Sequence, residues 1–349
     1  MRKILQLFQI KKDELKPSII LFFHSFFLVS VIITSKTARD SFFLSRFDKN
    51  FLPLMYILTA LIMWKGVGYI QQVLKGKNLL QQNIILHTSF AFGTILFIFF
   101  NKGVFVPILY LWVEIVTALM GMKFWELATN IFNSRQGKRL FGIITAGGSL
   151  SAVVTGMSIP QLVSYGSNSL IIFFSVGILL CMLLIFSLRK YFIRVPKGLK
   201  SEVEIPKFHL SKMEPFIAHI LFIIIILSSL STFVDYQFKI EIGNQFSSEL
   251  QMMKFFGKFY MITGIISIII QLFISGRILS YFGVSAGIGS YPFLTIAGTV
   301  TFIFFSPFFA LSLIKGVDQI IKPTMLGTSM ELIWLPISAK KKKITKPFF

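Results

Sequence analysis

Ionisable side chains stand inside long apolar runs at four places along this chain of 349 residues. A charge near the centre of a bilayer costs about 2.5–3.5 kcal/mol on insertion scales, so each such residue needs a partner or a function. Lysine and arginine could hold a phosphate or carboxylate group, while acids could couple to protons or set selectivity. The candidate substrate-binding or coupling residues are Lys36, Arg39, Glu114, Asp235, Lys315, Asp318, Lys322 and Glu331.

The first two groups differ in how easily a structural role explains them. Lys36, Arg39 and Asp40 share one helical face at the end of the first apolar run, where they could simply snorkel to the membrane interface. Glu114 lies near the middle of the run 104–132 and has no basic residue three or four positions away. An acid so placed favours a functional interpretation.

Local ion pairs are an alternative explanation elsewhere. Lys123 and Glu126 are three residues apart, and we expect them to neutralise each other. Asp235 and Lys239 are four residues apart, so an internal pair and a functional role both remain open for Asp235.

The strongest local signal is a charged stripe near the end of the chain. Lys315, Asp318 and Lys322 fall at i, i+3 and i+7 on one face, and Pro323 follows directly. A helix face with three charges cannot be exposed to lipid. We expect it to line a cavity or to bury against another helix.

The residues needed for catalysis or metal binding show no suitable spacing. The four histidines and Cys181 have no ligand spacing, and Gly147-Gly148 lacks the Lys-Ser/Thr of a phosphate loop. We therefore expect no enzyme activity, no cofactor and no metal. The histidines are His24, His87, His209 and His219.

The overall composition belongs to a polytopic membrane protein. Hydrophobic residues make up 54% of the chain and charged ones 14%, with 41 phenylalanines and a mean hydropathy of +0.76. These values exclude a soluble enzyme, a disordered chain and a disulfide-stapled secreted protein. The net charge is +21, and most of the basic residues lie between the apolar runs. This placement indicates basic loops that set the orientation of the protein in the membrane, and not nucleic-acid binding.

Ten apolar runs are long enough to cross a bilayer, which predicts an all-α polytopic membrane bundle of about ten helices. Of the 35 lysines and arginines, 23 fall in segments that an inside N-terminus would place inside, and 8 fall outside. This bias predicts that both termini are cytoplasmic. The runs are 17–36, 51–74, 80–101, 104–132, 141–164, 168–188, 213–238, 255–276, 284–305 and 306–336.

The order of the runs predicts two halves. Residues 1–195 would form a six-helix half, 196–212 a basic cytoplasmic linker, and 213–349 a half of four helices with a basic tail. Two repeated halves are typical of secondary transporters, with the first and fourth helices of each half equivalent. Because symmetry would ask for six helices in the second half, we expect either a shortened member of its class or a fragment.

Several stretches resemble the ATP/ADP translocase-type nucleotide transporters, which are related to the major facilitator superfamily. The most specific block is FWELATNIF at 124–132 with RQGKRLFG at 135–142 and AGGS at 146–149. Shorter similarities are KTARD at 36–40, VDYQFK at 234–239 and ELIWLPI at 331–337.

This resemblance implies a major facilitator-like fold of twelve helices in two six-helix halves, and a carrier of a bacterial inner membrane that exchanges nucleotides by alternating access. It also implies that residues important for transport fall on Lys36, Glu114 and Asp235. The family's exchangers usually carry a lysine where this chain has Met330.

These observations predict a carrier for nucleotides or related organic anions, with the bilayer and an anionic small molecule as its partners. The alternative is a non-transporting membrane module, derived from a carrier by truncation, that binds a ligand or a partner. In that case the basic tail, residues 340–346, could hold it to anionic lipid or to a partner. Its more ordinary role is that of an inside anchor.

Overall fold

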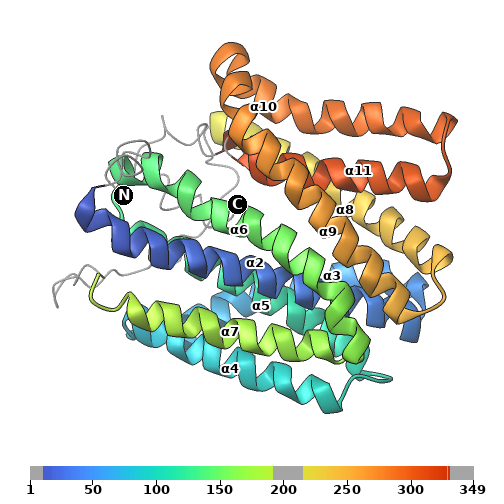
Figure 1. Ribbon diagram of the computed structural model, residues 1–349, viewed down its shortest axis with the longest axis horizontal. Coiled ribbons are helices and arrows are strands. Elements are labelled where there is room, and N and C mark those ends of the chain that lie inside the picture. The colour runs from blue at the N-terminus through green and yellow to red at the C-terminus, as the bar shows by residue number, and fades with distance from the viewer. Residues whose placement is uncertain (1–10, 192–214, 328, 331–349) are drawn as a thin grey trace. The chain divides into compact units, whose positions relative to one another are not determined.

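The computed structural model describes residues 11–191, 215–327, 329 and 330, and these residues form helices with no strand among them (Figure 1). Within the described residues, six α-helices precede residue 192 and four follow residue 214, with short 3-10 or π segments beside them. In chain order the helices are α2 (Lys12–Arg46), η1 (Lys49–Phe51), α3 (Leu52–Val73), α4 (Leu79–Phe99), α5 (Phe105–Ile131), α6 (Ser134–Leu162), η2 (Val163–Tyr165), α7 (Ser169–Ser187), α8 (Pro215–Gln245), α9 (Glu249–Phe273), α10 (Ser275–Thr299), η4 (Val300–Ile303), α11 (Pro307–Ile321) and η5 (Lys322–Leu326).

Within the described part of the chain, nine helices are long and apolar enough to cross a membrane. Each of these nine helices overlaps one of the first nine predicted runs. The chain is therefore a multi-pass helical membrane protein. The tenth run, 306–336, is described only to residue 330, and its helix α11 has 15 residues. The tenth span and the facilitator-like arrangement stay predictions.

The predicted end of the first helix is wrong. Helix α2 continues ten residues past Lys36 to Arg46, so Arg39 and Asp40 lie inside the helix and are buried. They do not snorkel from a helix end. The apolar run stops at Lys36 because hydropathy falls there. The helix can continue because the buried Arg39 is paired with Asp40 and with Glu114 of α5.

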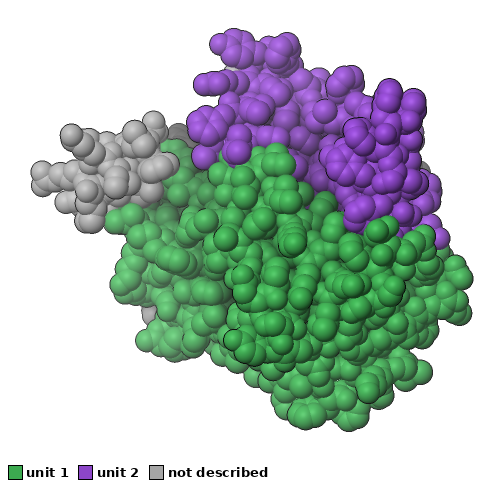
Figure 2. All heavy atoms as spheres, turned by 45° about the vertical axis from the view of Figure 1, so that its right-hand side comes forward, with its two compact units in different colours: residues 1–193, 242–268 green, residues 194–241, 269–349 purple. Residues whose placement is uncertain are grey.

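Two compact units emerge from the packing of the chain, coloured separately in Figure 2. One comprises residues 1–193 with 242–268, and the other comprises residues 194–241 with 269–349. Helices α8 and α9 each run from one unit into the other. The division into a six-helix half, a linker and a four-helix half stays a prediction, and the linker lies outside the described residues.

Helix α2 is the central element of the first unit, because it packs against α5, α6 and α7. Ion pairs fix both of its ends. Arg139 of α6 donates to Glu14 at 2.8 Å, and Arg46 forms a fork with Glu249 of α9 at 2.7 and 2.8 Å. Such paired geometry holds the helix in one register relative to its neighbours.

Small residues let helices approach α6 closely, as the spacing of Gly148, Ala152 and Gly156 predicts. A methyl group on Gly148 would lie 2.8 Å from Val29 of α2, and one on Gly156 would lie 2.5 Å from the backbone of Met261 in α9. The tightest contact in this helix is at Gly147, where a methyl group would lie 2.2 Å from the carbonyl oxygen of Phe22.

Gly147→Ala is therefore expected to lower the free energy of unfolding by about 1–3 kcal/mol, since backbone cannot move aside as a side chain can. Gly142 of the same helix has open space around it, so Gly142→Ala should be neutral or slightly stabilising. Equilibrium unfolding in mixed micelles measures both. Equal stability of the two variants would contradict this close approach of α2 and α6.

The second unit has a small core of its own around the end of α11. Buried side chains there include Leu227 of α8 and Tyr291 of α10 with Ile321 and Met325. Two irregularities shape its helices. Gly283 breaks α10 with φ 76°, and a π-turn over Lys322–Leu326 follows α11 where Pro323 cannot donate a backbone hydrogen bond.

Candidate functional site

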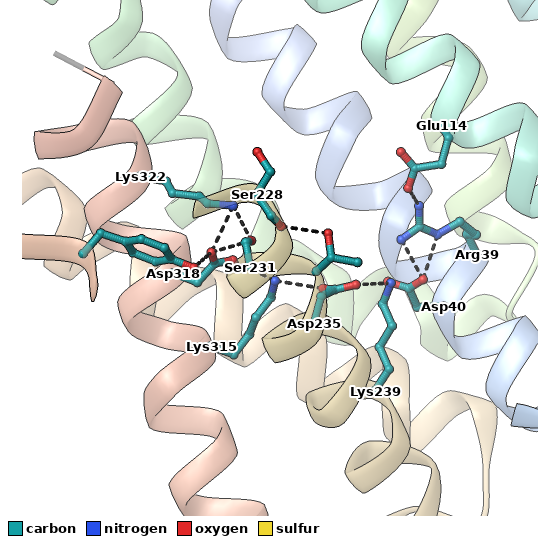
Figure 3. A network of polar contacts seen from close by, with 12 residues as sticks. Arg39, Asp40, Glu114, Ser228, Ser231, Asp235, Lys239, Lys315, Asp318 and Lys322 are labelled. Carbon is teal, nitrogen blue, oxygen red and sulfur yellow. Dashed lines mark hydrogen bonds and ion pairs between the residues drawn. The ribbon is translucent and has the colours of Figure 1, made fainter. Parts of the chain in front are cut away.

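The first polar network joins α2 to α5 around Arg39, as Figure 3 shows. The Arg39 guanidinium pairs with Asp40 at 2.7 Å and also with Glu114. Only 2% of the Arg39 side chain is exposed, against 26% for Glu114. Tyr110 lies under the guanidinium, with its ring centre 4.4 Å from the central carbon. One cation is thus enclosed by two carboxylates and an aromatic face.

Lys36 lies one turn before Arg39 on α2 and is partly buried. Together, Lys36, Arg39, Asp40 and Glu114 carry two positive and two negative formal charges. A lysine in that position is well suited to respond to an incoming anion, because its stem reaches along the helix while its ammonium remains a compact charge.

The second network centres on Asp318 of α11. Ser231 and the Tyr291 hydroxyl both donate to Oδ1, at 2.7 and 2.8 Å. Lys322 reaches the same oxygen at 3.1 Å, and Lys315 pairs with Oδ2 at 2.9 Å. An ionised carboxylate accepts about four hydrogen bonds, so Asp318 is fully satisfied. Its side chain is 5% exposed.

Asp235 of α8 extends this network across to a second helix. Its Oδ2 pairs with Lys239 at 2.6 Å, and its Oδ1 pairs with Lys315 at 2.8 Å. The local Asp235–Lys239 pair that the spacing allows is therefore present. Lys315 lies between the two carboxylates and connects α8 with α11 (Figure 3).

The charged stripe of α11 buries against other helices, which was one of the two predicted outcomes. It contacts α8 through Asp235 and α10 through Tyr291. Three lysines share two aspartates in this network, so it carries one formal positive charge in excess. Lys322 is its most exposed charged member, at 37% of the side chain. An excess cation with an accessible ammonium is suited to bind an anion.

Several members of these networks were missed from the sequence. Tyr110, Tyr291 and Ser231 read as ordinary residues of apolar runs. Ser231 was within reach of sequence reasoning, because it precedes Asp235 by four residues and shares its helical face. The tyrosines gave no signal, since their importance comes from helices distant in sequence.

The remaining sequence predictions concern the Lys123–Glu126 pair, Glu331, the basic tail and metal binding. Lys123 and Glu126 pair at 2.6 Å, as predicted, and Gln82 also accepts from Lys123. Glu331 lies outside the described residues, as does the basic tail, so their predicted roles stay predictions. Among the residues that the structure describes, no group of three or more potential ligands could hold a metal ion.

Comparison with known proteins adds no further assignment. Neither a scan of protein-family models nor a search of curated proteins finds a match to this chain.

Proposed function

We propose that this protein is a membrane carrier for nucleotides or related organic anions, that it works by alternating access, and that it is a transporter without enzyme activity. The observation that carries the proposal is the Asp318 network, in which three lysines share the buried Asp318 and the partly buried Asp235. Burying charge is costly, and three charges on one helix face far exceed what packing alone requires.

Anion binding is the chemistry that fits this excess. A phosphate or carboxylate group near Lys322 would neutralise the surplus positive charge, and the lysine would still have its neighbours Ser231 and Asp318 to return to. Ion pairs that release and re-form in this way are suited to a cycle between two conformations. Asp235 and Glu114 would then set selectivity or coupling.

Nucleotides are the substrate class that the sequence resemblance favours, particularly the block at 124–149. Lys36, in the first unit, is among the residues that the resemblance implies are important for transport. Exchange of one nucleotide for another needs no coupling ion, whereas proton coupling would use one of the acids. We propose exchange, in keeping with the resemblance.

Lys36→Gln is expected to abolish uptake of labelled nucleotide by membrane vesicles while the protein still inserts. The substitution keeps a polar side chain but removes the positive charge of Lys36, one turn before Arg39 on α2. Immunodetection of the variant in the membrane fraction is the control. Unchanged uptake would remove Lys36 from the transport site.

The same assay separates the proposal from the truncated binding module. A module of that kind would bind labelled ATP or a partner without moving nucleotide across the bilayer. Equilibrium binding with the purified wild-type protein, together with vesicle uptake, therefore distinguishes the two. Binding without uptake supports the module, and uptake supports the carrier.

A further inference from the structure

A hollow of about 540 Å³ lies in the first unit, at the ends of helices α2 and α7. Three cations line it, namely Lys16 of α2 with Arg189 and Lys190 directly after α7. The described lining residues include no acid, and all three cations are exposed. Three like charges around one hollow repel one another, and an anion placed between them relieves that repulsion. Neither the proposed carrier function nor the two polar networks uses these residues.

Helix ends alone do not explain this grouping. The carbonyl end of α7 favours cations nearby, which accounts for Arg189 and Lys190. Lys16 has no such reason, because it belongs to the second turn of α2. Arg189 is also held in place, with its guanidinium carbon 4.5 Å from the centre of the Phe186 ring. The cations thus come from two helices and meet at one hollow.

Exposed apolar side chains lead along both helices to these cations. On α2, Ile19 and Phe23 follow Lys16 at i+3 and i+7, so all three share a face. On α7, Leu183 and Phe186 are exposed, and Phe186 is four residues before Lys190. Apolar stripes that end at cations match a molecule with an acyl chain and an anionic head.

We propose that this hollow binds an anionic phospholipid, with the headgroup phosphate between Lys16, Arg189 and Lys190 and an acyl chain along α2 and α7. The ends of both helices are ends of candidate membrane spans, which is the depth of lipid headgroups. The cation excess of the predicted inside segments places the site in the cytoplasmic leaflet, where anionic lipids attract basic residues.

Native mass spectrometry of the purified full-length protein tests the site, with dioleoylphosphatidylglycerol titrated against dioleoylphosphatidylcholine. The wild type should retain phosphatidylglycerol preferentially. The double variant Lys16→Gln/Lys190→Gln should bind it at least about tenfold more weakly, because each basic residue near an anionic surface contributes severalfold. The charge-keeping variant Lys16→Arg/Lys190→Arg should retain binding and checks that the fold tolerates changes there.

A matched control comes from another helix end. Lys75 and Lys77 follow α3, are exposed, and are predicted to lie on the same side of the membrane. Lys75→Gln/Lys77→Gln removes the same charge and should bind phosphatidylglycerol within about twofold of the wild type. Equal weakening in both double variants would overturn the proposal, since general surface charge would then explain the binding. Displacement of the lipid by millimolar inorganic phosphate would also overturn it, because the acyl chain would then contribute nothing.

Discussion

Arg39→Gln is expected to lower the free energy of unfolding by about 3–5 kcal/mol, which is a large part of the stability of a typical domain. The guanidinium is 2% exposed and is shared by Asp40 and Glu114. Removing it takes from the buried Asp40 carboxylate the guanidinium to which it is bonded at 2.7 Å. Equilibrium unfolding in mixed micelles measures the loss.

A second substitution tests the cause of that loss. If the penalty comes from the ion pair that the Asp40 carboxylate loses, Arg39→Gln/Asp40→Asn should regain part of the stability that Arg39→Gln loses. Lys102→Gln, at an exposed site between α4 and α5, should change little. A double variant no more stable than Arg39→Gln would show that packing over Tyr110, and not charge, is what Arg39 provides.

Asp318→Asn is expected to have the second large effect, with a comparable loss of about 3–5 kcal/mol together with loss of transport. The amide keeps the volume of the carboxylate but removes its charge. Lys315 would keep Asp235 as a partner, whereas Lys322 would lose the carboxylate that it contacts at 3.1 Å. The hydroxyl of Tyr291 would also face a weaker acceptor.

The stability loss of Asp318→Asn can be compared with the losses expected from substituting Asp235 and Glu126. Asp235→Asn should cost less than Asp318→Asn, because the Asp235 side chain is 24% exposed and water can replace part of the interaction. Glu126→Gln should change stability little, since its pair with Lys123 is at the surface. If all three variants lost the same stability, the central position assigned to Asp318 would be wrong.

Sequence alone predicts what depends on short-range periodicity. The apolar runs anticipated the nine candidate spans, and spacing of three or four residues anticipated the pairs Lys123–Glu126 and Asp235–Lys239. Insertion cost singled out Glu114 and the α11 stripe as charges that need partners. For the two pairs, the relevant neighbours lie within two turns of one helix.

Contacts between helices could not be predicted in the same way. Arg39 and Glu114 are 75 residues apart, and Tyr291 and Asp318 are 27 apart, so no helical period relates them. The wrong end for the first helix has the same origin. Hydropathy counts Arg39 and Asp40 as polar, but the tertiary partner on α5 makes their burial possible.

The most direct measurement of the central claim is counter-exchange in proteoliposomes loaded with ADP and supplied with labelled ATP. We expect uptake by the wild type that depends on internal ADP, uptake reduced at least about tenfold by Lys322→Gln, and no change with Lys102→Gln. Uptake no greater than in protein-free liposomes, or a Lys322→Gln variant that exchanges as fast as the wild type, would contradict the assignment of the α11 lysines to nucleotide binding.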